Sequence, residues 1–291
     1  MSTALDIVAD AVDLYVHAEP DLLPRRSDDL GLAAELSVAG YAAAVHRHHF
    51  SDTVDRARLA SDATGFDLRG AVLLNDAVGG LNPAAAELAL RLGGRWIGLP
   101  TLSAAFFRSG LSAMPAALRD TLGFGPGRLR LVDDAGRVLP EVQDILELAV
   151  GAGAVVNVGY CSAAEAHAVL AAVPRHDRLV LTTPLGAMRL QPPELDELMT
   201  HPGVHVEVTA YSLHPDGPSQ GRNPDAVAGA AALIRRVGVD RCVLSSDGGM
   251  AGAPGPPELL AWAAGHLAEA GLNDAEIVRL VRETPAALLG L

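Results

Sequence analysis

Eight short runs of apolar and β-branched residues recur along the chain, separated by longer stretches rich in Ala and Leu. Nearly continuous apolar runs of this kind are typical of parallel strands that are covered on both faces. We therefore predict strands at Val12–His17, Ala42–His46, Leu68–Leu74, Arg95–Leu99, Ala154–Val158, Leu179–Thr183, Val204–Thr209 and Arg241–Ser245.

The stretches between these runs carry signals for the start of helices. Asn82–Pro83 and Asn223–Pro224 each place a capping side chain before a proline at the first helical position. Asn273 with Glu276 three residues later resembles a capping box. Eight strands alternating with helices predict a single-domain (β/α)8 barrel over residues 1–291, with a doubly wound open sheet as the alternative.

One segment interrupts this alternation. Residues Ser103–Pro140 are too many for an ordinary loop between a strand and a helix. Within them, Arg128–Val132 and Arg137–Leu139 alternate on either side of Asp133–Gly136, which predicts a β-hairpin. Because the insertion follows the fourth strand, we expect it on the catalytic face as a lid, or else as an ornament without function. A second loop, Tyr211–Arg222, follows the seventh strand on the same face.

Composition excludes several classes of protein. Acidic residues outnumber basic ones by 35 to 22, which argues against a nucleic-acid or anionic-membrane surface. No run reaches about 18 uncharged apolar residues, so no membrane span is expected. Two cysteines are too few for a disulfide scaffold, and the N-terminus does not resemble a signal peptide. We expect a cytoplasmic protein that acts on a small molecule and can form a homo-oligomer.

The basic residues are all arginine. The sequence has no lysine among its 22 basic residues. A lysine Schiff base, a phosphate-loop lysine and a carboxylated lysine bridging two metals are therefore impossible. Any chemistry must come from other side chains.

Polar residues stand where the predicted strands end, which is where the reacting groups of a barrel lie. Tyr15 and His17 are two residues apart and share one face of the first strand. His48 and His49 follow the second strand, and Asp247 follows the eighth. One divalent metal such as zinc or iron, held by His17, His48 and Asp247, suits these groups. Acid–base chemistry without a metal suits them equally well.

Further candidates follow the other strands. Glu207 lies within the seventh strand, as a base or as part of an ion pair, and His214 lies in the loop after it. Substrate-binding residues are expected at the ends of strands three to six and in the loop after strand seven: Asn75, Thr101, Cys161, Thr183 and His214. We expect Arg25–Arg26 to lie in a solvated loop rather than to bind an anion.

In their order along the chain, these motifs resemble the amidohydrolase superfamily of metal-dependent hydrolases. The resemblance covers nearly the whole chain and rests on segments 13–17, 48–49, 79–83, 139–141, 244–247 and 284–291. It implies a (β/α)8 barrel that hydrolyses a small organic molecule.

The chain also departs from the superfamily pattern. Tyr15 occupies the first position of the usual His-x-His, and Tyr160 and Thr183 stand where ligands on strands five and six are expected. We therefore expect no binuclear metal centre, and an acid–base reaction in which Asp247 accepts a proton, His49 relays one, and Tyr15 and Tyr160 donate hydrogen bonds. The reaction would be hydrolysis, or a related addition, elimination or cyclisation, for example in specialised metabolism. A mononuclear metal hydrolase and a non-catalytic ligand-binding barrel are the alternatives.

Overall fold

The computed structural model describes residues 8–111, 120, 122–217 and 225–291. Their contacts divide the chain into two compact units. The first unit comprises residues 1–46, 56–69 and 206–291, and the second comprises residues 47–55 and 70–205. Each unit is described by itself.

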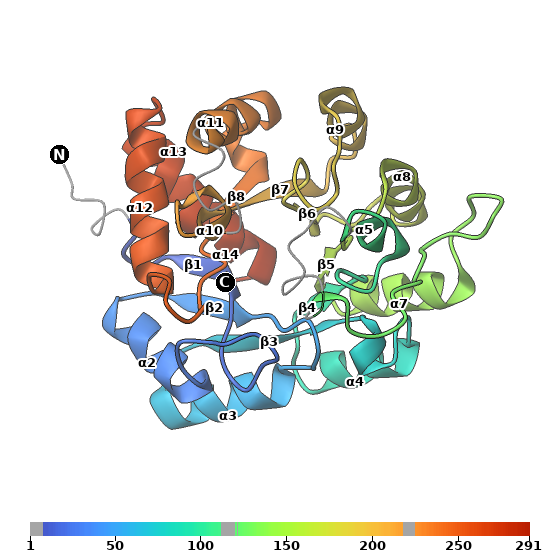
Figure 1. Ribbon diagram of the computed structural model, residues 1–291, viewed down its shortest axis with the longest axis horizontal. Coiled ribbons are helices and arrows are strands. Elements are labelled where there is room, and N and C mark those ends of the chain that lie inside the picture. The colour runs from blue at the N-terminus through green and yellow to red at the C-terminus, as the bar shows by residue number, and fades with distance from the viewer. Residues whose placement is uncertain (1–7, 112–119, 121, 218–224) are drawn as a thin grey trace. The chain divides into compact units, whose positions relative to one another are not determined.

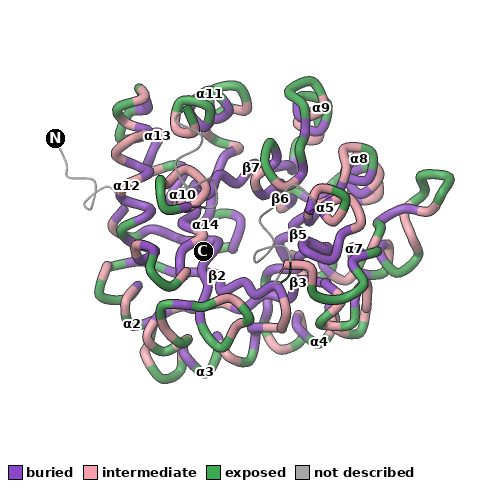
Figure 2. The backbone as a smooth tube through the Cα atoms, in the orientation of Figure 1, coloured by how far each residue is buried: buried purple, intermediate pink, exposed green. Residues whose placement is uncertain are grey.

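All eight predicted strands are present, and each end lies within one residue of its predicted position. They are β1 (Val12–Val16), β2 (Ala43–His46), β3 (Leu68–Leu73), β4 (Trp96–Gly98), β5 (Val155–Asn157), β6 (Leu179–Thr182), β7 (Val204–Thr209) and β8 (Cys242–Ser245). Almost every strand residue is buried, as the continuous apolar runs predict (Figure 2).

The strands pair in parallel and in chain order, from β1 to β8. The chain after β8 then returns to the end of β1. The amide of Asp247 donates to the carbonyl of Tyr15 over 2.8 Å, and the amide of His17 donates to the carbonyl of Gly248 over 2.9 Å. An open sheet would leave these two strands as unpaired edges, so the (β/α)8 barrel is the fold and the doubly wound alternative is wrong.

Helices alternate with the strands (Figure 1). The longer ones are α2 (Asp29–Val38), α3 (Val54–Thr64), α4 (Pro83–Arg91), α7 (Pro140–Gly151), α8 (Ala163–Ala172), α9 (Pro192–Leu198), α11 (Ala226–Val237) and α12 (Pro256–Glu269). The shorter ones are η1 (Asp76–Val78), α5 (Ala105–Arg108), α10 (Ala210–Leu213), η3 (Val239–Arg241), α13 (Asp274–Val278), the π-helical η4 (Arg279–Glu283) and α14 (Thr284–Leu289).

Two of the predicted caps are confirmed. The Asn82 side chain accepts a hydrogen bond from the amide of Ala84 at the start of α4. Asn273 and Glu276 form a capping box at the start of α13. The third predicted cap, Asn223–Pro224, lies outside the described residues.

The insertion after β4 differs from its prediction. In place of a two-stranded hairpin, its described part has one isolated antiparallel bridge, between Val132 and Val138. A turn closes that bridge, with the amide of Asp133 donating to the carbonyl of Arg137 over 2.8 Å. Residues 112–119 and 121 of the insertion are outside the described part.

The described part of the insertion is attached near the carboxyl ends of the second unit's strands. The amide of Gly127 donates to Oδ2 of Asp76, in the segment after β3, over 2.7 Å. The amide of Leu131 donates to Oε1 of Glu165, in the first turn of the helix after β5, over 3.0 Å. Within this unit, the described part of the insertion therefore lies at the carboxyl ends of the strands, which is where we expected a lid.

No helix among the described residues is long and apolar enough to cross a membrane.

Gly70 in β3 packs directly against the backbone at the start of α3. A Cβ atom there would lie 2.2 Å from the Cα of Val54 and 2.5 Å from the carbonyl oxygen of Thr53, both of them backbone atoms. We expect Gly70→Ala to destabilise the protein by about 3 kcal/mol, because the backbone must move. Gly229→Ala, in the exposed interior of α11 with open space around it, should instead stabilise it by about 0.5–1 kcal/mol. Urea unfolding of both variants checks this, and equal effects would contradict it.

Candidate functional site

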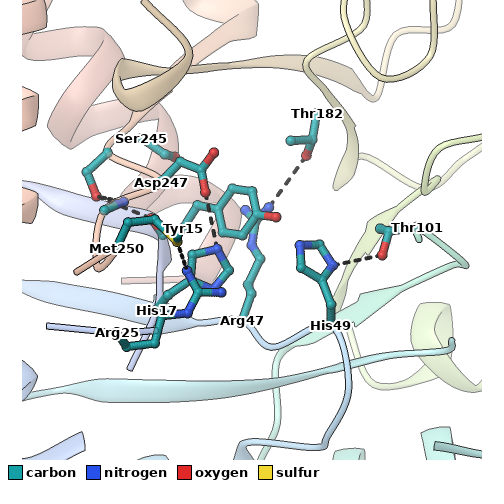
Figure 3. A network of polar contacts seen from close by, with 12 residues as sticks. Tyr15, His17, Arg25, Arg47, His49, Thr101, Thr182, Ser245, Asp247 and Met250 are labelled. Carbon is teal, nitrogen blue, oxygen red and sulfur yellow. Dashed lines mark hydrogen bonds and ion pairs between the residues drawn. The ribbon is translucent and has the colours of Figure 1, made fainter. Parts of the chain in front are cut away.

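The first unit brings together three predicted side chains. Nε2 of His17 lies 3.2 Å from Oδ1 of Asp247 (Figure 3). The ring of Tyr15 lies 4.9 Å from the ring of His17, measured between centroids. His17 and Tyr15 are almost fully buried, whereas 22% of the Asp247 side chain is exposed. The carboxylate is therefore the member of the group that solvent or a ligand can reach.

The backbone holds Asp247 in an unusual conformation. Its φ is +53°, in the left-handed region that non-glycine residues seldom adopt. Two residues on, Gly249 has a φ of +125°, and a Cβ atom there would lie 2.2 Å from the carbonyl oxygen of His17. Strained backbone of this kind costs about 1–3 kcal/mol and is concentrated at functional sites. The strain at Asp247 therefore favours a functional role over a simple capping role.

Two residues near Asp247 were not among the predicted site residues. Arg25 is 5% exposed, so the expectation of a solvated Arg25 is wrong. Its Nε donates to Oδ2 of Asp21 over 2.7 Å, and its Nη1 lies 2.9 Å from Sδ of Met250. Burial, followed by the charge of Asp247, raises the pKa of Tyr211. Tyr211 therefore stays protonated at neutral pH and can donate a hydrogen bond.

Only one of these two residues had a signal in the sequence. Tyr211 opens the loop that was predicted after the seventh strand, so its position pointed to the site. Arg25 lies in an irregular segment, where the pattern of apolar residues carries no information about burial.

The second unit holds a separate buried polar group at the ends of its strands. Nδ1 of His49 lies 2.9 Å from Oγ1 of Thr101 (Figure 3). Nδ2 of Asn75 donates to that same Oγ1 over 2.8 Å, and Oδ1 of Asn75 accepts from the amides of Thr101 and Ser103. His49, Asn75 and Thr101 thus lie together at these strand ends. The amide of Asn75 is occupied on both sides, which suits a positioning role.

Two other predicted residues of this unit stand at strand ends. The ring of Tyr160, after β5, lies 6.4 Å from the ring of His49. Thr183, after β6, has a φ of +44°, which is a genuine outlier for a β-branched residue. Cys161 is buried, and burial raises the pKa of its thiol far above the usual range. A thiol that stays protonated is a poor nucleophile, which argues against a nucleophilic role for Cys161.

Arg47 was not predicted and is deeply buried in the second unit. Its guanidinium carbon lies 3.6 Å over the ring of Trp96, and its Nη1 lies 3.5 Å from Oγ1 of Thr182. Nδ2 of Asn157 donates to the same threonine oxygen. Arg47 thus contacts side chains of β4 and β6, and β5 shares the threonine oxygen through Asn157.

His46, in β2, and His48, after it, hydrogen-bond to backbone amides of the chain. Nδ1 of His48 accepts hydrogen bonds from the amides of Phe50 and Ser51, at 3.0 and 2.9 Å. His46 accepts from the amide of Ala18 and lies 2.9 Å from Asp29 with its other nitrogen. Among the residues that the structure describes, no three His, Cys, Asp or Glu side chains are placed to hold a metal ion.

Glu207 belongs to a buried group within the first unit. Oγ of Ser245 donates to its Oε1 over 2.7 Å, and Glu207 is fully buried. Asp13, also fully buried, accepts hydrogen bonds from the amides of Tyr15 and Ser246. Burial, together with the charge of Glu207, raises the pKa of Asp13 to about 6 in spite of these hydrogen bonds, which lower it. This placement favours a structural role for Glu207.

His214 ends α10 in the first unit. Its ring packs edge-on against Trp262 at 4.7 Å, and its Nδ1 accepts from the amide of Asp216. These contacts tie the loop after β7 to α12.

Comparisons with known proteins agree with this fold. The family model described as "Family of unknown function (DUF6282)" matches residues 10–207. No curated protein sequence is recognisably similar to the chain.

Several solved structures have the same fold. A probable 2-pyrone-4,6-dicarboxylic acid hydrolase from Acinetobacter baumannii, with citric acid bound, is 13% identical, with a TM-score of 0.62 over 97% of this chain and 100% of that one. An amidohydrolase from Pseudomonas aeruginosa is 12% identical, with a TM-score of 0.64 over 99% and 98%. An enamidase of the amidohydrolase superfamily is 15% identical, with a TM-score of 0.57 over 97% and 68%. The structural neighbours are thus members of the superfamily that the motifs resemble.

The raised pKa of Asp13 predicts how stability depends on pH. Below about pH 4 the carboxyl is protonated in both the folded and the unfolded states. As pH rises from about 4 to about 6, only the unfolded state ionises readily, so this group's contribution to stability falls by about 3 kcal/mol. Asp13→Asn keeps an acceptor for both amides and removes the charge, so it should be more stable relative to the parent at pH 7 than at pH 4.

Urea unfolding of the parent and of Asp13→Asn at pH 4, 5, 6 and 7 measures this difference. Because the other titrating groups are common to both proteins, their effects cancel. A constant difference across these pH values would contradict a raised pKa for Asp13.

Proposed function

The chain belongs to the family DUF6282, and we propose that it is an amidohydrolase-fold enzyme that performs acid–base chemistry on a small organic molecule without a binuclear metal centre. The names of the structural neighbours, a dicarboxylic acid hydrolase, an amidohydrolase and an enamidase, support a hydrolytic reaction. The favoured reaction is hydrolysis of an amide, ester or lactone. Cyclisation, addition and elimination use the same proton transfers.

The observation that carries this proposal is the pair formed by His17 and Asp247 on a strained backbone. The Asp247 carboxylate is the most accessible member of its group, and it acts as the general base that takes a proton from water or substrate. His17, at 3.2 Å, orients that carboxylate and stabilises its charge. Tyr211 and Tyr15 supply phenolic hydrogen bonds to the negative charge that develops on the substrate.

We assign two further roles in the second unit on the basis of strand position. His49, held by Thr101, relays a proton, and the phenol of Tyr160 donates a hydrogen bond. Asn75 and Thr101 position His49, and Thr183, with its left-handed backbone, is proposed to contact substrate. His214 is the residue to which the catalytic role would pass if Asp247 proved dispensable, since Glu207 is fully buried.

Metal content tests the first part of the proposal. Because Tyr15, Tyr160 and Thr183 stand where superfamily ligands are expected, we expect fewer than two metal equivalents per chain by elemental analysis, even after incubation with zinc. Tyr15→His should not raise this number to two, since the other positions still lack ligands. Two tightly held equivalents in the parent protein would contradict this part, and one would favour a mononuclear hydrolase.

Asp247→Asn tests the catalytic role. Asparagine tolerates left-handed backbone about as well as aspartate does, so unfolding free energy should change by less than about 2 kcal/mol. Removing the base should lower turnover by about 10²- to 10⁴-fold. Turnover is measured on p-nitrophenyl acetate, dihydrocoumarin and N-acetylated amino acids as ester, lactone and amide probes.

Two controls accompany this variant. Cys161→Ala should keep the parent rate, because its thiol stays protonated. Tyr160→Phe should cost less than Asp247→Asn, because it removes a single hydrogen bond. A folded Asp247→Asn that turns over at the parent rate would refute the base assignment, and probe binding without any turnover in the parent would favour a ligand-binding barrel.

A further inference from the structure

Aromatic residues make up only 4% of the chain, yet four of them gather at one edge of the second unit. Phe50 follows β2, Phe107 and Phe124 lie in the insertion after β4, and Tyr160 follows β5. Phe50 and Phe124 meet edge to face at 5.8 Å and 82°, and Phe107 and Tyr160 meet at 5.2 Å and 42°. We call these four residues the aromatic wall.

The wall is only partly explained by core packing. Phe107 is buried in an apolar cluster with Leu102, Ala104 and Leu111. Phe50 and Tyr160 are only partly buried against that cluster. Phe124 is 50% exposed. The wall therefore has one side that faces the insertion's core and another that stays accessible.

Arg108 holds the exposed member of the wall in place. Its Nη1 donates to the carbonyl of Gly123 over 2.7 Å. Its Nη2 donates to the carbonyls of Phe124 and Gly125. Its Nε donates to the carbonyl of Leu102 over 2.5 Å. A single guanidinium thus joins the start of the insertion to the loop that carries Phe124.

Asp76 ties down the other end of the same loop. Its Oδ2 accepts from the amide of Gly127 over 2.7 Å, and its side chain closely approaches Gly125. The loop 123–127 has no regular structure, yet two charged side chains hold it. Phe124 is therefore presented, half exposed, from a loop whose position is fixed on both sides.

We propose that the aromatic wall is a subsite that binds a planar aromatic or conjugated ring of the small-molecule substrate. The inference deepens the proposed function, on which it rests. Rings pack well against edge-to-face aromatic pairs, and Arg108 turns its charge toward backbone carbonyls instead of toward the ring faces.

His49 and Thr101, which lie beside the aromatic wall, indicate which substituent the bound ring has. The ring of His49 lies 6.4 Å from both Phe50 and Tyr160, and Thr101 is bonded to it. A hydroxyl or carbonyl substituent on the bound ring would meet hydrogen-bonding groups there. The expected ligand is therefore an aryl or conjugated ring with a polar substituent, and not an aliphatic chain.

Binding of 2-naphthol and of its saturated analogue decahydro-2-naphthol tests the proposal by calorimetry. The parent should bind 2-naphthol the more tightly. Phe124→Ala should weaken 2-naphthol about two- to twelvefold, the range expected for one aromatic pair, and leave the saturated analogue nearly unchanged. Phe106→Ala is the matched control, because its ring, on the same helix as Phe107, packs under the guanidinium of Arg189 at 4.1 Å.

A second variant tests the loop. Arg108→Met keeps the side-chain stem and removes the hydrogen bonds to the loop, so it should reduce 2-naphthol binding as Phe124→Ala does. Arg189→Met, which leaves that loop intact, should not. Melting temperatures confirm that each variant is folded.

Two outcomes would overturn the subsite. One is parent-like 2-naphthol binding by both Phe124→Ala and Arg108→Met. The other is self-association of the parent in sedimentation that Phe124→Ala abolishes, with no naphthol binding, because a second copy would then be what covers the wall. Since binding is measured without turnover, failure here leaves the role of Asp247 intact, and an active Asp247→Asn leaves the subsite intact.

Discussion

Backbone pairing between β1 and the chain after β8 is the interaction on which the first unit's site depends. It joins the ends of the strand series, and it continues past the ends of both strands to Asp247 and Gly248. That continuation fixes the register in which His17 and Asp247 face each other. It also requires a left-handed Asp247 and a Gly249 without a side chain, because a Cβ atom there would collide with the backbone of His17. The hydrogen bonds that close the sheet are therefore the same ones that place the candidate base, Asp247.

Strands β1 and β7 of the first unit each contribute a buried carboxyl group near the end of β8. Asp13 accepts from the amide of Ser246, and Glu207 accepts from the hydroxyl of Ser245. Hydrogen bonds favour the charged form of Asp13, but complete burial outweighs them and raises its pKa to about 6. We therefore expect Asp13 to lower the protein's free energy of unfolding as pH rises toward neutrality.

The strands could be predicted because buried parallel strands have nearly continuous apolar sequences. The rule that barrel chemistry lies where strands end singled out His49, Asn75 and Thr101 one by one, and the contacts among them come from the folded structure. Ring orientation follows no such rule. His48 and His49 look equivalent in the sequence, yet His48 turns its Nδ1 to two backbone amides. Arg25 was misjudged for a similar reason, since its burial depends on Asp21 and Met250.

The insertion shows where local pattern stops being informative. Its turn was recognisable, because Gly136 adopts a left-handed φ of +76° and Asp133 caps the turn. Strands on either side of a turn need partners along their length, however, and here pairing ends after one bridge. The loop's shape comes instead from Arg108 and Asp76, which reach across 15 or more residues. Such contacts leave no periodic trace, so a segment without regular structure can still hold an aromatic ring in a defined place.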